Sequence, residues 1–252
     1  MLCQRKPTSF CVSLDVHGTT TPFKISKKCS KNFRWMVNVA DPLTQNHLCS
    51  GVLVKPDLVM TTATGLHQLQ SGAHPKVIIG TNDINGEGGD KPEILDTQKI
   101  IVHPRFNGAA TSGPDLALLQ LSQNSHNSPL ETWSSMSGCR NGPLSFVGWF
   151  ISRRGGAPET TLSCVPNMKV VEHGQCAEVL KGLHEGSVCC GNSGTGNPVF
   201  DNGGPLLCGE NKLVGLASKT ELIGGQHYPT SFVEVSEFKN WIESRGEMKD
   251  EL

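Results

Sequence analysis

The chain has 252 residues, a formal net charge of −1, 18% charged side chains, 28 glycines and 15 prolines. This balance of charge gives no electrostatic bias toward nucleic acid or anionic lipid, so neither is expected as a partner. No apolar run is long enough to span a bilayer, and the many turn-forming residues favour short strands over long amphipathic helices.

In chain order, the first predicted element is an irregular leader over residues 1–22, which has no apolar periodicity. Apolar residues, alternating at 35–39, then predict strands over 35–39, 47–54, 75–80 and 94–102. A short amphipathic helix is predicted over 237–245, because Phe238, Trp241 and Ile242 follow helical spacing.

The ten cysteines are widely spaced, which favours disulfides in an oxidising compartment. Cys189 and Cys190 are the only close pair, and no C-x-x-C motif is present, so neither a metal site nor a cofactor is expected. Residues 1–6 lead into no apolar signal core, which leaves open an earlier start or another route of export.

The last four residues, Lys249-Asp250-Glu251-Leu252, match the tetrapeptide read by the receptor that returns soluble proteins to the endoplasmic reticulum. A solvated charged tail is the alternative interpretation. Together with the cysteines, the match predicts the secretory pathway, either the lumen of the endoplasmic reticulum or the extracellular space.

Three motifs carry the functional prediction: DNGGPLLC at 201–208, PDLALLQL at 114–121 and VMTTATG at 59–65. They resemble G-D-S-G-G-P-L-x-C, D-I-A-L-L-x-L and V-L-T-A-A-H-C of the chymotrypsin/trypsin-like serine proteases, and the resemblance covers roughly 29–245. It implies an all-β fold of two six-stranded antiparallel Greek-key β-barrels with a C-terminal α-helix. It also implies strands at 146–149, 162–166 and 213–219, and a short helix after Cys176.

The resemblance places Thr64 at the histidine of the catalytic triad, Asp115 at the aspartate and Asn202 at the serine. A threonine hydroxyl does not titrate near neutral pH and cannot serve as the general base. An asparagine amide cannot replace the serine as the acyl acceptor. Asp115 is then expected to be a buried acceptor for backbone amides or for Thr64.

Two residues could replace the missing groups. His67 lies three residues after Thr64, but a shift of one turn carries an imidazole away from a fixed nucleophile, so a surface histidine is the favoured interpretation. Ser193 lies in GNSGTG at 191–196, which resembles G-D-S-G, but the Gly-Pro-Leu and the cysteine that follow Asn202 are missing there.

The resemblance also implies changes around the catalytic groups. Phe200 stands at a glycine whose amide would point into the oxyanion hole. Ser218 is kept in the substrate-pairing strand, Lys219 replaces a tryptophan of the pocket wall, and Thr230 stands at a pocket-wall glycine. Both cysteines of the pocket disulfide are lost, one of them at Pro198.

Active members of this family carry a new N-terminus whose ammonium group pairs with the aspartate that corresponds to Asp201. Cleavage after Lys24 would expose Ile25, but the segment to Cys29 would then be two residues shorter than in trypsin. This ammonium group is therefore not expected to form here.

Three disulfides of the family can be filled: Cys29 with Cys164, Cys139 with Cys208, and Cys176 with Cys189 or Cys190. Each could add about 2 to 4 kcal/mol of stability. Cys49 has lost its usual mate, which stands as Gly65 in this chain. Cys3, Cys11, Cys49 and one of Cys189 and Cys190 stay unassigned, and pairing with the leader is expected ahead of a bond to another chain.

The sequence thus predicts a leader (1–22), a trypsin-like homology domain (23–246) and a tail (247–252). The expected function is that of a non-catalytic serine protease homologue that binds a protein partner: a protease, an inhibitor or another secretory-pathway protein. Such a chain could act as a cofactor, decoy or regulator of an active protease. The alternatives are a trypsin-like endopeptidase using His67 or Ser193, and a resident of the endoplasmic reticulum with a folding or storage role.

Overall fold

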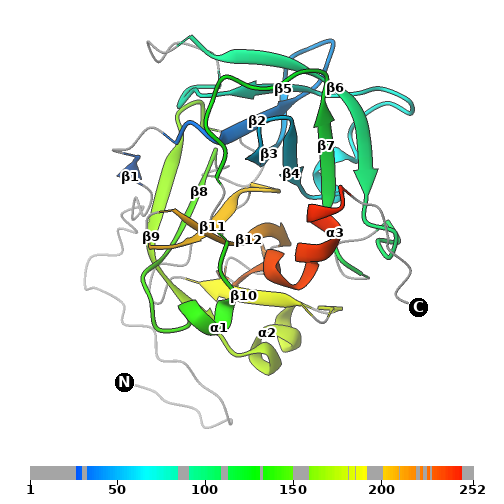
Figure 1. The fold of residues 1–252 in the computed structure, drawn as a ribbon. Helices are drawn as coiled ribbons and strands as arrows, with labels where there is room; N and C mark the ends of the chain where they lie inside the picture. The colour runs from blue at the N-terminus through cyan, green and yellow to red at the C-terminus, as the bar shows by residue number, and fades with distance from the viewer. Residues whose placement is uncertain are drawn as a thin grey trace, which may run out of the picture.

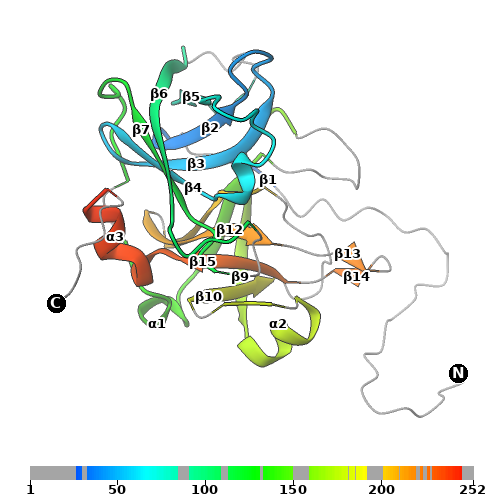
Figure 2. The same ribbon diagram turned by 90° about the vertical axis from the view of Figure 1, so that its right-hand side faces the viewer.

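The computed structural model describes residues 27–29, 33–84, 91–108, 113–130, 133–149, 159–180, 182–184, 186–191, 201–209, 211–219, 222–223, 226–227 and 229–245. Its strands form two barrels, one above the other in Figure 1 and again in the turned view of Figure 2. No helix in these ranges is long and apolar enough to cross a membrane. Predictions that concern Cys3, Cys11, Ser193, Phe200 and the last four residues lie outside the described residues.

The first barrel is the upper one in Figure 1. Its strands are β2 (Met36–Ala40), β3 (His47–Lys55), β4 (Leu58–Thr61), β5 (Lys76–Ile79), β6 (Glu93–Val102) and β7 (Ala117–Leu121). They pair in the order β2-β3-β4-β7-β6-β5, and pairing of β2 with β5 closes the barrel. The four strands predicted from apolar patterning are confirmed here, with ends shifted by a residue or so.

The second barrel is built from β8 (Leu144–Gly148), β9 (Ser163–Val171), β10 (Ser187–Gly191), β11 (Pro205–Cys208), β12 (Lys212–Lys219) and β15 (Thr230–Glu234). Pairing of β8 with β9 closes it, and β1 (Lys27–Lys28) adds one further strand beside β9. Among the residues that the structure describes, the short strands β13 (Leu222–Ile223) and β14 (Gln226–His227) pair only with each other. The predicted class, all-β with two six-stranded antiparallel barrels, is confirmed.

Strand β9 extends beyond the predicted end at Pro166 and reaches Val171. The register between β8 and β9 shifts between Leu144 and Phe146, and Asn167 adopts a left-handed backbone with φ of 59°. This irregularity accommodates the missing N–H of Pro166, so the strand can resume after it.

The helices differ in detail from the prediction. Helix α1 (Met136–Cys139) was not predicted, and α2 (His173–Val179) begins before Cys176 rather than after it. The C-terminal helix is divided into a 3-10 turn, η2 (Val235–Phe238), and an α-helical part, α3 (Lys239–Glu243). It packs onto the barrels through buried Trp241 and Ile242.

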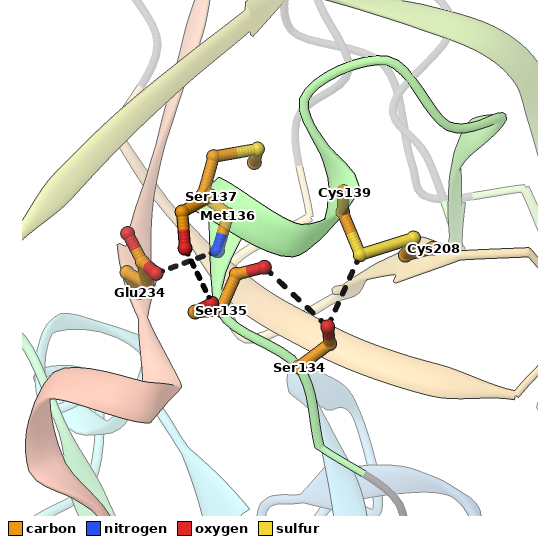
Figure 3. Close-up of a disulfide and its surroundings, with 7 residues drawn as sticks. All are labelled: Ser134, Ser135, Met136, Ser137, Cys139, Cys208 and Glu234. Carbon is orange, nitrogen blue, oxygen red and sulfur yellow. Dashed lines mark hydrogen bonds between the residues drawn. A yellow bond between two sulfur atoms is a disulfide. The ribbon is translucent and has the colours of Figure 1, made fainter.

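The three disulfides that the resemblance implies are present: Cys29–Cys164, Cys139–Cys208 and Cys176–Cys189. Figure 3 shows the second of them, which joins α1 to the end of β11. Ser134 Oγ lies 3.2 Å from Cys139 Sγ, and Met136 N donates to Glu234 Oε1 at 2.7 Å. These contacts fix the segment through which the chain enters the second barrel.

The two barrels share an apolar core. One cluster of buried side chains contains Leu53 and Met60 from the first barrel together with Leu213 and Val233 from the second. Burial of this shared surface holds the barrels together. It also brings residues that are far apart in the sequence to the boundary between the barrels, where the candidate site lies.

Candidate functional site

The candidate site is centred on Asp115, which precedes β7 and is fully buried. Thr64 N donates to Asp115 Oδ1 at 2.8 Å, and Thr64 Oγ1 donates to Asp115 Oδ2 at 2.5 Å. Ser218 Oγ, from β12 of the second barrel, donates to the same Oδ2 at 2.6 Å. The prediction that Asp115 accepts bonds from Thr64 and from a backbone amide is confirmed.

Thr64 begins the 3-10 turn η1 (Thr64–Leu66), which is separated from the end of β4 by two residues, Thr62 and Ala63. This turn brings both its backbone N–H and its hydroxyl group to the Asp115 carboxylate. A histidine in such a position could take up a proton and release it again, whereas a threonine hydroxyl cannot do so near neutral pH. The hydrogen bonds between Thr64 and Asp115 can therefore stabilise the fold, but these two side chains cannot move a proton to or from a substrate.

His67 does not take the place of Thr64. It lies at the end of η1, where its N–H is bonded to the carbonyl of Thr64, and it is exposed. Its ring lies 6.0 Å from the ring of Phe106. The groups that donate to Asp115 in the described part of the chain belong to Thr64 and Ser218, and His67 is not among them.

Asn202 lies in a turn that is bonded to strands of both barrels. Its carbonyl accepts from Ser50 N at 2.8 Å, and Gly203 N donates to Ala217 O at 2.8 Å. Gly203 has φ of 77°, and a Cβ there would lie 2.0 Å from Ser50 O. Only glycine fits this position, so β3 and the turn are packed backbone against backbone.

Asp201 is the second buried carboxylate near the site, with an exposure of 3%. Its Oδ2 accepts from Ser50 Oγ at 2.6 Å and from Trp149 N at 2.7 Å. His47 Nε2 lies 3.3 Å from its Oδ1, and His47 Nδ1 lies 2.7 Å from Asn38 Oδ1. Asp201 is thus paired by groups of the folded barrels, and Ile25, the expected new N-terminus, lies outside the described residues.

The group formed by Ser50, His47 and Asp201 contains the residue types of a catalytic triad but not its arrangement. In a working triad the serine hydroxyl bonds to the imidazole, which in turn bonds to the carboxylate. Here the hydroxyl donates directly to the carboxylate, and Ser50 has an exposure of 0%. The group therefore holds the 201–204 turn in place and offers no nucleophile to a substrate.

Sequence reasoning missed the roles of His47, Ser50 and Asn38. One signal was available, because all three are polar residues in strands that are otherwise mostly apolar. A polar side chain that a strand buries needs a hydrogen-bonding partner. The pattern could have indicated the need for partners, but not that Asp201 would meet it.

The pocket positions lie on neighbouring strands. Ser218 is 6% exposed and is bonded to Asp115, so its hydroxyl is directed into the boundary between the barrels. Lys219 pairs with Ser231 across β12 and β15. Thr230, at the start of β15, is 4% exposed and pairs with Cys190 of β10.

The prediction that Cys49 and Cys190 form disulfides with the leader is wrong. Cys49 and Cys190 are both free thiols with exposures of 1% and 0%. Burial raises the pKa of each thiol to about 12. Both thiols therefore stay protonated and unreactive at neutral pH.

Comparison with known proteins establishes the family. The family model described as Trypsin matches residues 24–242. The chain belongs to the trypsin family. The match spans both barrels, η2 and most of α3, so it includes each described residue of the candidate site.

Individual members of the trypsin family resemble the chain at moderate identity. Chymotrypsin-like elastase family member 1 of Bos taurus is 29% identical over 214 residues, which cover 78% of this chain and 77% of the relative. Granzyme B of Rattus norvegicus is 28% identical over 226 residues, which cover 86% and 87%. The solved structure of neuropsin, a serine protease of mouse brain, has a TM-score of 0.73 at 21% identity and covers 88% of this chain and 99% of that one.

Proposed function

We propose that this chain is a non-catalytic member of the trypsin family that acts by binding a protein partner, and that it regulates an active protease in the secretory pathway. The observation that carries the proposal is the bonding of Asp115. Its oxygens are occupied by Thr64 and Ser218, at the position where the family resemblance places the imidazole of the general base.

The state of the nucleophile position supports the same proposal. The side chain that the resemblance places there belongs to Asn202, whose amide cannot form the acyl-enzyme intermediate of a serine protease. The carbonyl of Asn202 is also bonded to Ser50 of the other barrel, which fixes the turn. Proteolysis would need a base and a nucleophile from elsewhere in the chain.

Proteolysis through His67 or Ser193 is the rival function, and the active proteases among the relatives favour it. The decisive experiment exposes the folded chain to a fluorophosphonate probe and to a panel of peptide substrates, with an active trypsin as the positive control. We expect neither labelling nor hydrolysis. Labelling that is lost in the Ser193→Ala variant, or hydrolysis that is lost in His67→Ala, would overturn the proposal.

We also propose residence in the lumen of the endoplasmic reticulum, with 23–246 as the homology domain and 247–252 as a tail that carries the retrieval signal. The three disulfides support an oxidising compartment. Deletion of Lys249-Asp250-Glu251-Leu252 should send the protein into the medium, and a residue added after Leu252 should have the same effect. Unchanged retention in both variants would refute residence through this signal.

A further inference from the structure

The turn between β2 and β3 carries the most exposed large apolar side chain in the described part of the molecule. Leu43 is 80% exposed, compared with 52% for Ile94 and 43% for Val102. This segment, residues 41–46, is here named the Leu43 turn, and it projects from the upper barrel as the blue hairpin in Figures 1 and 2. A single exposed leucine is common on protein surfaces, so the conformation of the turn must carry the argument.

The Leu43 turn is held in one conformation by Asp41. The Oδ1 atom of Asp41 accepts from Leu43 N at 3.0 Å, from Thr44 N at 2.8 Å and from Thr44 Oγ1 at 3.0 Å. The backbone N–H groups of Thr44 and Leu43 lower the pKa of Asp41, so its carboxylate stays charged and keeps these bonds. The turn is closed by Asp41 N donating to Asn46 O at 2.9 Å and by Gln45 N donating to Asp41 O at 3.0 Å.

The base of the turn is fixed to the second barrel. Ala40 pairs with His47 where β2 and β3 meet the turn. His47 lies between Asn38 and Asp201, and Ser50 N donates to Asn202 O farther along β3. The hairpin is thus bonded to both barrels, and the exposed leucine is attached to a rigid base.

We propose that the Leu43 turn is the surface through which this chain binds its protein partner, with Leu43 entering an apolar pocket of that partner. The inference rests on the proposed binding function. Because the bonds to Asp41 fix the backbone of the turn before binding, association does not have to order this segment, and burial of the leucine contributes more of its value to affinity. Ile94 also has a fixed backbone, since it pairs with Ile78 across β5 and β6, but its side chain is 52% exposed, compared with 80% for Leu43.

The rim of the Leu43 turn indicates the chemistry of the partner. Thr44, Gln45 and Asn46 are exposed and uncharged, and the one carboxylate, Asp41, is engaged by the turn itself. An apolar centre with a neutral polar rim is the usual anatomy of a protein interface. The partner surface is therefore a protein pocket of leucine size with a neutral, hydrogen-bonding edge, rather than a charged polymer.

The test places a photo-crosslinking amino acid at position 43 of the full chain, or at position 94 as the matched control, during expression in the secretory pathway. We expect one crosslinked protein at position 43 that is absent at position 94. That protein is then purified, and its Kd is measured for wild type, Leu43→Asp, Ile94→Asp and Asp41→Ala, with thermal unfolding as a check of each fold.

We expect Leu43→Asp to raise the Kd at least about tenfold, because burial of an interface anchor dominates affinity. Ile94→Asp should change the Kd less than about twofold. Asp41→Ala should raise the Kd by an amount between those of Leu43→Asp and Ile94→Asp, because it loosens the turn but keeps the leucine. Equal crosslinking at both positions, or a Kd unchanged by Leu43→Asp, would overturn the inference and leave the binding function standing. Probe labelling that is lost in Ser193→Ala, or peptide hydrolysis that is lost in His67→Ala, would instead overturn the proposed function.

Discussion

Gly65 lies against the buried thiol of Cys49, and this contact predicts opposite effects for two substitutions at one position. A Cβ at Gly65 would lie 2.6 Å from Cys49 Cβ and 2.7 Å from Cys49 Sγ. The Gly65→Ala variant adds this atom without any new bond, so it overpacks the site. The Gly65→Cys variant brings a second thiol to the first, and oxidation can then join the two.

The expected magnitudes follow from the same geometry. Overpacking by Gly65→Ala should cost about 1 to 3 kcal/mol of unfolding free energy. A disulfide closing a loop of about 16 residues is worth about 3 kcal/mol before strain. The Cβ atoms of a disulfide are about 3.8 Å apart, whereas the Cβ at position 65 would lie 2.6 Å from Cys49 Cβ. The turn η1 must therefore move by about 1 Å, which reduces the net gain to about 1 to 2 kcal/mol.

The assay is urea unfolding without reductant, combined with alkylation of the denatured protein and mass analysis of its peptides. In oxidised Gly65→Cys, Cys49 should resist alkylation and the unfolding midpoint should rise above that of Gly65→Ala. The control is Cys49→Ala/Gly65→Cys, which cannot form the bond and should resemble Gly65→Ala. Complete alkylation of Cys49 in oxidised Gly65→Cys would refute the packing described here.

Three further predictions concern stability and are checked by urea unfolding. Ser50→Ala removes one donor from buried Asp201 and should cost about 1 to 3 kcal/mol, whereas the exposed Ser137→Ala should change stability by less than about 0.5 kcal/mol. Gly203→Ala should cost about 2 to 4 kcal/mol, since φ is 77° and the new Cβ would lie 2.0 Å from a carbonyl oxygen. Burial, with nearby positive charge, lowers the pKa of His103 from 6.5 to about 4. On acidification the unfolded chain therefore takes up a proton at this residue before the folded chain does, and the free energy of unfolding should fall by up to about 3 kcal/mol as the pH drops from 6.5 to 4. An equal loss of stability in His103→Gln over this pH range would contradict the assignment to His103.

Much of the fold could be predicted because its determinants are local or shared by the family. Strands β2, β3, β5 and β6 follow from apolar patterning within short windows. The disulfides follow from the family resemblance, since they join residues up to 135 positions apart and no local pattern specifies such pairs. Strand β9 reaches Val171, beyond the 162–166 that the resemblance implies, because its continuation past Pro166 depends on the irregular pairing with β8 around Asn167, which no local pattern specifies.

The candidate site was predictable only in part. The contact between Thr64 and Asp115 follows from aligning two motifs with one family, and the structure contains it. The bonds of Asp201 could not be predicted, because Ser50 lies 151 positions away in the sequence and the family pattern assigns it no role. The contact between Cys49 and Gly65 follows from the resemblance, which places Gly65 at the usual mate of Cys49, and the structure contains it. That Cys49 stays a free thiol could not be predicted, because no local pattern shows whether another cysteine reaches it.

The two buried carboxylates explain how residues of a protease-like site can be kept without serving proteolysis. A carboxylate removed from water must be bonded, and loss of its donors destabilises the fold. Asp115 joins the barrels through Thr64 and Ser218, and Asp201 joins them through Ser50 and His47. Each aspartate thus has a structural reason to be present, so the two together do not count as evidence that the chain cleaves peptides.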